Sequence, residues 1–333
     1  MRTPVGLVVA ALMTLGAVQA FAPRETPPLA ATRLAVDRMQ INTLSTSKAG
    51  LVAGGELGTL LYSTDQGQHW ERALVSAQRQ ALINQISFSP DGLQGMAVGH
   101  EGWILRTSDG GLSWTEVAFD EKNGEPLMGI ARMPSGAWIT VGAFGRALRS
   151  DDQGAHWEPL ALPESVADKH LNRIVGSAGG QHWLLVGEQG LVLRSTDGGA
   201  HWAVVEPFYN GSLYNAMALP GGGWLAYGMR GHVFRSDGLE APWTRSAMPA
   251  QVSFFGHATT ADGQIVLVGQ GSLVATSKDG GRNFSLGRVQ GRANLTDLVL
   301  APNGTGWLAS DAGLQAFSAA ATASTPSSHG AAQ

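Results

Sequence analysis

The 333-residue chain contains no cysteine and has only 14% charged residues. The absence of cysteine excludes disulfides, thiolate metal ligands, a thiol nucleophile and a lipid-modified N-terminal cysteine. The formal net charge is −4 and no polybasic stretch occurs, so we expect no nucleic-acid partner. The one long apolar run, Val5 to Val18, is shorter than the roughly 20 residues that a transmembrane helix needs.

This run lies in an N-terminal segment with the pattern of a secretory signal. Arg2 precedes it, and Ala20-Phe21-Ala22 or Val18-Gln19-Ala20 offers the small residues of a cleavage site. We therefore predict that residues 1–22 are a cleaved signal peptide, with a retained anchor as the alternative. The mature chain is then exported, in a bacterium to the periplasm, and soluble after cleavage.

Glycine is abundant, with 45 residues, and many of them fall in a repeated eight-residue segment. Ser195 to Trp202 reads STDGGAHW, and this segment is called the repeat turn below. Close copies begin at Ser63, Thr107, Ser150 and Ser277, and a worn copy with a displaced aspartate begins at Ser236. In such a turn the aspartate accepts backbone hydrogen bonds, glycine supplies positive φ and the closing aromatic covers the turn. The residues with these structural roles are Asp65, Asp109, Asp152, Asp197 and Asp279, closed by Trp70, Trp114, Trp157, Trp202 and Phe284.

The repeat turns follow a regular period. Their closing aromatics, with Trp243 in the worn copy, lie 41 to 45 residues apart. A glycine also stands eight residues before each turn, at Gly55, Gly99, Gly142, Gly187, Gly228 and Gly269. A period of about 40 to 50 residues with short strands between tight turns is typical of β-propeller blades.

Six repeat units are complete, and a seventh, from Leu295 to Phe317, has three strands and then stops. We predict an all-β, seven-bladed β-propeller over residues 23–318 with four-stranded antiparallel blades. A strand from the N-terminal segment would close the last blade, because an open sheet edge would otherwise remain. Six blades and a cap are the alternative count. Residues 319–333 are small and polar and are predicted to form a disordered tail.

The combination of a VG-x-x-G segment, an apolar strand and S-x-DGG-x-x-W resembles BNR or Asp-box repeats. Seven such units in an exported chain resemble the photosystem II stability and assembly factor family, over roughly Met39 to Phe317. The resemblance implies a non-catalytic scaffold that binds a membrane protein during assembly. One departure is the missing cysteine, since cyanobacterial members are typically lipid-anchored.

Arginines are the candidate partner-binding residues. Four of them directly precede the repeat turns of blades two to five: Arg106, Arg149, Arg194 and Arg235. Arg146 and Arg230 lie in Gly-x-x-Gly turns, where we expect greater exposure. The guanidinium groups either bond carbonyls and carboxylates between blades or form a basic surface for an acidic partner. In the resembling family an arginine-lined patch binds the partner, which favours the second interpretation.

Other chemistries were weighed against this scaffold. His69, His156 and His201 precede closing tryptophans, but equivalent positions in separate blades stay far apart, so we expect no metal and no cofactor. Asp-box repeats also occur in sialidases and other glycosidases, and Tyr209, Tyr214 or Tyr227 could serve as a nucleophile. A carbohydrate-active propeller is therefore the alternative function.

The repeats contain no inserted catalytic loop, and we predict a protein that is not an enzyme. We expect a monomer that binds a membrane or exported protein, with a glycan as a second class of partner.

Overall fold

The computed structural model describes residues 5–21, 34–122 and 124–322. The chain divides into two units, Met1–Leu34 and Ala35–Gln333. The first contains helix α1 (Val5–Phe21), which covers most of the predicted signal segment. Within the described ranges, no helix has the length and apolar character needed to cross a bilayer.

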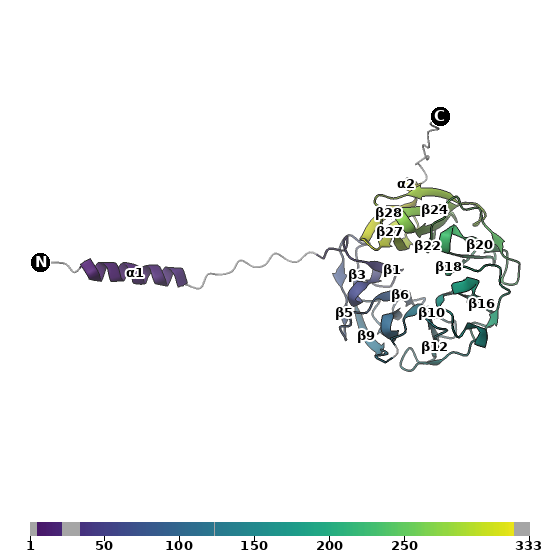
Figure 1. Ribbon diagram of the computed structural model, residues 1–333, viewed down its shortest axis with the longest axis horizontal. Helices are drawn as coiled ribbons and strands as arrows, with labels where there is room; N and C mark the ends of the chain where they lie inside the picture. Colours follow the sequence, from purple (N-terminus) through teal and green to yellow (C-terminus); the bar gives the residue numbers. More distant parts are fainter. Residues whose placement is uncertain (1–4, 22–33, 123, 323–333) are drawn as a thin grey trace, which may run out of the picture. The chain divides into compact units, whose positions relative to one another are not determined.

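The second unit is a seven-bladed β-propeller, viewed along its axis in Figure 1, so the predicted fold class is confirmed. Within each blade the strands are antiparallel and follow one another outward from the axis. The innermost strands are β1 (Ile41–Thr46), β6 (Ile83–Phe88), β10 (Leu127–Arg132), β14 (Leu171–Gly176), β18 (Leu213–Ala218), β22 (Phe254–Thr259) and β26 (Leu295–Leu300). The second strands are β2 (Leu51–Gly55), β7 (Gly95–Gly99), β11 (Trp138–Gly142), β15 (Trp183–Gly187), β19 (Trp224–Gly228), β23 (Ile265–Gly269) and β27 (Thr305–Ser310).

The outer strands complete the blades. The third strands are β3 (Leu60–Ser63), β8 (Ile104–Thr107), β12 (Ala147–Ser150), β16 (Val192–Ser195), β20 (Val233–Ser236), β24 (Leu273–Ser277) and β28 (Gly313–Ser318). The fourth strands are β4 (Glu71–Arg72), β9 (Ser113–Ala118), β13 (Glu158–Pro159), β17 (Ala203–Val204), β21 (Thr244–Arg245) and β25 (Ser285–Arg288). The short strand β5 (Leu74–Val75) leaves blade one and pairs in parallel with β9 of blade two.

The second strands carry most of the core. In β7, β11, β15, β19 and β23 every residue is buried. These strands read as continuous apolar runs rather than alternating ones, because a neighbouring blade covers each face. Trp103, Trp138 and Trp224 are among the largest fully buried side chains. The sequence therefore encodes blades that are stable only when stacked on one another.

A close approach of two backbone segments explains the glycine before each repeat turn. A Cβ on any of these six glycines would lie 2.0 to 2.4 Å from the carbonyl oxygen that precedes the innermost strand of the same blade. For Gly187 this oxygen belongs to His170, at 2.3 Å.

The turn that follows each of these glycines contains a residue with positive φ. Two positions after the glycine, five blades have a non-glycine residue at φ between 51° and 58°: Leu57, Glu101, Phe144, Gln189 and Arg230. Most of these turns form short 3-10 segments: η1 (Glu56–Gly58), η2 (His100–Gly102), η4 (Glu188–Gly190), η5 (Met229–Gly231) and η6 (Gln270–Ser272). One further segment, η3 (Glu164–Val166), connects blades three and four.

The predicted closure by an N-terminal strand is not present in the described residues. The last sheet contains only β26, β27 and β28. A single backbone hydrogen bond, from Leu314 N–H to Val36 O at 2.8 Å, joins the N-terminal segment to β28. Residues 35–38 form a turn instead of a strand, and the preceding residues 22–33 lie outside the described ranges.

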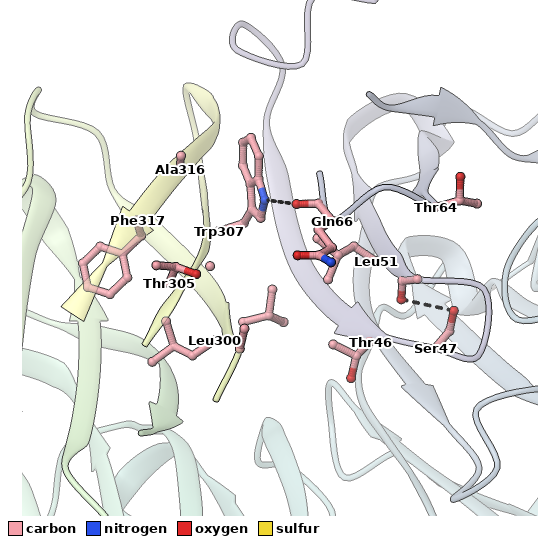
Figure 2. A pocket seen from close by; sticks show the side chains of 14 residues that line it. Thr46, Ser47, Leu51, Thr64, Gln66, Leu300, Thr305, Trp307, Ala316 and Phe317 are labelled. Carbon is pink, nitrogen blue, oxygen red and sulfur yellow. Dashed lines mark hydrogen bonds between the residues drawn. The ribbon is translucent and has the colours of Figure 1, made fainter. Parts of the chain in front are cut away.

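In the described part of the chain, side-chain contacts join blades seven and one (Figure 2). The Trp307 indole N–H donates to Gln66 O at 2.9 Å, and its ring packs edge-on against Trp70 with centroids 6.0 Å apart. Nearer the axis, Thr296 Oγ1 donates to Ile41 O at 2.6 Å. Among the described residues, these contacts join blades seven and one both near the axis and farther out.

The first four residues of the predicted disordered tail are ordered. Residues 319–322 form the short helix α2 (Ala319–Thr322), and Ala319 is buried. Its N–H donates to Gly304 O at 2.9 Å. The remainder, residues 323–333, lies outside the described ranges.

The close approach at Gly187 gives a test of the repeat. We expect Gly187→Ala to lower stability by about 1 to 3 kcal/mol, since a methyl group would meet a backbone oxygen that cannot rotate away. The melting temperature should fall by roughly 2 to 4 °C per kcal/mol. Gly179→Ala in the same blade is the control, because its Cβ would meet no atom within 4 Å. Equal melting temperatures for the two variants would contradict this explanation.

The closure seam gives a second test. Trp307→Phe keeps an aromatic ring against Trp70 but loses the hydrogen bond to Gln66, so we expect a loss of about 1 kcal/mol in unfolding free energy. Trp307→Ala removes the ring as well and should cost more. Urea unfolding measures both. If neither variant shifts the midpoint, the ring is held closed by other contacts.

Candidate functional site

Each repeat turn is held by one hydroxyl and one aspartate. In blade four, Ser195 Oγ donates to Asp197 Oδ1 at 2.8 Å and accepts from Gly199 N–H at 2.9 Å. Asp197 Oδ1 also accepts from His201 N–H at 3.0 Å. The same three contacts recur around Asp65, Asp109, Asp152 and Asp279. In the worn copy, Ser236 Oγ instead faces the carbonyls of Gly238 and Ala241. The carboxylates therefore serve separate turns and do not share a catalytic site.

The closing aromatics pack across to the preceding blade. Trp202 shares a core cluster with Met133 and Ile139 of blade three. Trp114, Trp157 and Phe284 likewise pack on blades one, two and five, and Trp70 packs on blade seven. The repeat turn is thus a joint between two blades as well as a corner within one.

The three histidines before closing tryptophans lie apart and on the surface. His69, His156 and His201 are 85%, 86% and 91% exposed, and each places Nδ1 within 2.6 to 2.7 Å of the aspartate of its own turn. In the part of the chain that the structure describes, no group of three His, Cys, Asp or Glu residues could hold a metal ion.

Three of the four arginines that precede the repeat turns reach into the next blade. Arg106 donates to Gln153 O at 3.2 Å, and Arg235 donates to Gly280 O at 2.8 Å. Arg194 faces Leu239 O at 3.5 Å and Glu240 at 3.4 Å. Each of these carbonyls belongs to the fourth residue of the repeat turn in the next blade. Gln66 is the fourth residue of the repeat turn in blade one, and its carbonyl accepts the hydrogen bond from Trp307.

These contacts limit what the repeated arginines can offer a partner. Arg149 departs from the pattern and pairs with Asp151 at 2.7 Å in its own turn. Arg149, Arg194 and Arg235 are 13% to 32% exposed. The geometry matches the interpretation in which guanidinium groups bond carbonyls and carboxylates around the blades.

The two arginines in Gly-x-x-Gly turns differ from each other. Arg146 is only 19% exposed and pairs with Asp120 at 2.9 Å and Glu125 at 3.4 Å, so the expectation of greater exposure is wrong for it. The two carboxylates come from the connection between blades two and three, which folds over the turn. Arg230 is exposed, and no hydrogen bond or ion pair joins it to the described residues.

A second exposed arginine, Arg245 in β21, lies close to Arg230. Burial, followed by the positive charges of Arg245 and Arg230, lowers the pKa of His232. The same two charges act on Tyr209, whose pKa is raised chiefly by burial. Arg230 and Arg245 are called the blade-five pair below. The sequence analysis missed Arg245 because it considered only arginines at repeated positions.

A cavity of about 470 Å³ lies at the axis and is lined by residues from all seven innermost strands. Figure 1 shows these strands surrounding the axis. The charged and titratable lining residues are Arg132, Arg173, His257 and Asp297. The sequence analysis missed these residues because it considered positions that recur in several blades, and these positions differ from blade to blade. Gly129, Arg173, Asn215 and Asp297 share one register in blades three, four, five and seven, each following the irregular pairing near the start of its strand.

Burial shifts the titration of these axial groups. It raises the pKa of Asp297 to about 6, against hydrogen bonds from the backbone and the charge of Arg173. It lowers the pKa of His257 to about 4, aided by the charge of Arg173. The His257 imidazole is 2.7 Å from the Tyr227 hydroxyl. Near neutral pH the axis therefore carries two guanidinium cations and one carboxylate, with His257 uncharged.

The tyrosines do not form a glycosidase-like site. Tyr227 is fully buried, and burial raises its pKa well above the ordinary value, which opposes formation of a phenolate nucleophile. Tyr209 packs among His232 and Phe234, and Tyr214 packs against Phe255. None of the three belongs to the lining of the axial cavity.

A second cavity, of about 570 Å³, lies in the seam between blades seven and one. Figure 2 shows Leu51, Leu300, Trp307 and Phe317 around it. Gly306 lines this cavity and stands where blades three to five have Trp138, Trp183 and Trp224 at the same register.

No protein-family model matches the chain. The chain is 24% identical over 243 residues to the photosystem II assembly lipoprotein Ycf48 of Synechococcus sp. strain CC9902. The aligned region covers 71% of this chain and 72% of that protein. A solved structure of YCF48 bound to a D1 peptide matches with a TM-score of 0.67 at 22% identity, over 87% of this chain and 96% of the other. The resemblance to photosystem II assembly factors is thus confirmed, and the protein is an assembly-factor-like propeller.

The same fold also carries enzymes. A catalytically inactive virginiamycin B lyase from Staphylococcus aureus with quinupristin matches with a TM-score of 0.71 at 13% identity, over 85% of this chain and 95% of the other. Structural similarity at this level establishes the propeller fold and leaves its activity to the residues themselves.

The repeat turns predict a dependence of stability on acid. Hydrogen bonds from the backbone N–H and then the imidazole of His69 lower the pKa of Asp65 to about 2, and similar bonds lower that of Asp197. A carboxylate with a lowered pKa in the folded state stabilises the fold above its unfolded pKa, near 4. This contribution is lost as the pH falls from about 4 through the folded value.

We therefore expect the urea midpoint to fall between pH 4 and pH 2, and to fall less in Asp197→Asn, which has one titrating turn fewer. Identical pH profiles for the two proteins would show that this turn does not contribute to acid unfolding.

Proposed function

We propose that the protein is a non-catalytic propeller that holds a segment of a membrane or exported protein during its assembly or transport. Its similarity to Ycf48 assembly proteins supports a binding scaffold of this kind. The peptide bound to a structurally similar YCF48 supports a partner that is a protein segment. The apolar run from Val5 to Val18 supports export, in a bacterium to the periplasm.

The observation that carries the choice of surface is the exposed blade-five pair. Most arginines of the repeat are held by carbonyls or carboxylates of neighbouring turns, whereas Arg230 and Arg245 are exposed. Exposed guanidinium groups that form no ion pair with the described residues attract a partner that carries carboxylates. We assign the binding surface to blade five, with these two arginines as its charged contacts.

A carbohydrate-active propeller is the alternative function. The observation in its favour is the pair of arginines at the axis together with Asp297, since arginines and a carboxylate are parts of a sialidase-like site. The burial of Tyr227 removes the nucleophile that such a site needs at the same place. We therefore favour the scaffold.

The test is cross-linking in cells followed by mass spectrometry of captured proteins. We expect Arg230→Glu combined with Arg245→Glu to reduce capture of the specific partner at least tenfold, because reversed charges repel an acidic surface. Arg292→Glu is the matched control, since Arg292 is also exposed but precedes β26 on another blade.

Unchanged capture by the double variant would remove blade five from the interface. Efficient hydrolysis of a sialoside or another glycoside by the purified protein would replace the scaffold with the alternative function.

A further inference from the structure

Two arginine side chains at the propeller axis lack polar partners in the described part of the chain. Arg173 lies in the middle of β14, and Arg132 ends β10 on the neighbouring blade. The Nε atom of each is buried without a hydrogen-bond partner, and both residues line the axial cavity. A guanidinium group carries five N–H donors and stays charged in proteins. Burying such a group without partners is costly, so its presence here requires an explanation.

The surroundings of Arg173 do not satisfy it. Asp297 acts on it electrostatically, but the two groups form no ion pair. The Asp297 carboxylate instead accepts from Leu44 N–H at 2.9 Å and from Leu298 N–H at 2.9 Å. Arg132 lies over the Trp138 ring at 6.0 Å, a contact that leaves its N–H donors unused.

Three other polar side chains that line the cavity already form hydrogen bonds. Gln85 Oε1 accepts from Ile130 N–H at 2.7 Å. Asn215 donates to Phe255 O at 2.9 Å and accepts from Ala216 N–H at 2.9 Å. His257 bonds Tyr227. Among the charged groups described around the cavity, the guanidinium donors are the ones that remain for a ligand.

We propose that the axial cavity binds a carboxylate group, held by Arg173 and Arg132. Guanidinium groups bind carboxylates through paired, charge-assisted hydrogen bonds. Among the residues that line the cavity, two guanidinium cations face the single Asp297 carboxylate, and Asp91, outside the lining, acts electrostatically on Arg132. A monoanion meets less repulsion from Asp297 than a phosphate dianion does.

The size of the cavity limits the ligand. A volume of about 470 Å³ falls within the roughly 300 to 1,000 Å³ that small-molecule sites occupy. It accommodates either a free small carboxylic acid or the end of a peptide chain with its terminal carboxylate. This site is separate from the blade-five pair, so the two assignments can fail independently.

Isothermal titration calorimetry of the full chain at low salt tests the assignment with four probes. They are butyrate, acetyl-trialanine with a free C-terminal carboxylate, the same peptide as its amide, and inorganic phosphate. We expect the free-acid peptide or butyrate to bind and the amide to be silent. Binding of the peptide acid identifies a chain terminus as the ligand, and binding of butyrate alone identifies a small free acid. Silence from both carboxylates, or tighter binding of phosphate, would overturn the proposal.

Variants then locate the site. Arg173→Gln and Arg132→Gln should each weaken carboxylate binding at least tenfold, since each removes a charged donor. Arg292→Gln, on the surface, should leave it unchanged, and so should the double charge reversal at the blade-five pair. If circular dichroism shows that Arg173→Gln is unfolded, Arg132→Gln decides. Unchanged affinity in a folded variant of either axial arginine would overturn its role.

Discussion

The structure depends on a hydrogen bond that crosses from one blade to the next. A blade of four short strands cannot bury both of its faces alone, so each needs a defined joint with its neighbour. The carbonyl of the fourth residue in the repeat turn supplies it. Arg106 bonds this carbonyl at Gln153, Arg235 bonds it at Gly280, and Trp307 bonds it at Gln66 where the ring closes. The closing aromatic of the same turn packs on the same neighbour.

This joint explains why a repeated arginine is a poor guide to a binding surface. A residue that recurs at the same position of several blades has equivalent surroundings in each of them. It is therefore expected to make the same structural contact in each blade. Arg106, Arg194 and Arg235 accordingly reach the following turn. Arg230 and Arg245 come from blade five, whose repeat turn is worn, and they are exposed. Recognition of a partner is better sought where the repeat is broken.

The axis follows the same rule. Along the innermost strands the residues at one register are Gly129, Arg173, Asn215 and Asp297 in blades three, four, five and seven. A fold made of near-identical units thus presents different chemistry at the one place where all units meet. The outer joints position the innermost strands, and with them the buried Nε atoms of Arg132 and Arg173 at the axis.

The sequence by itself determined the fold class and the position of nearly every strand, and it left six blades with a cap as an alternative to seven. Glycines at close backbone approaches and aspartates in turns act locally, and their period carries the architecture. Three features were decided only by the tertiary structure: the contact of Trp307 with Gln66 across the seam, the pairing of Arg146 with Asp120 and Glu125, and the meeting of Arg132, Arg173 and Asp297 at the axis. Each joins residues from different blades, between which spacing along the chain carries no information about distance. The hydrogen bonds of a turn form between residues that are close in the sequence, so the sequence pattern predicts them. Contacts between blades depend instead on which side chains the closed ring brings together.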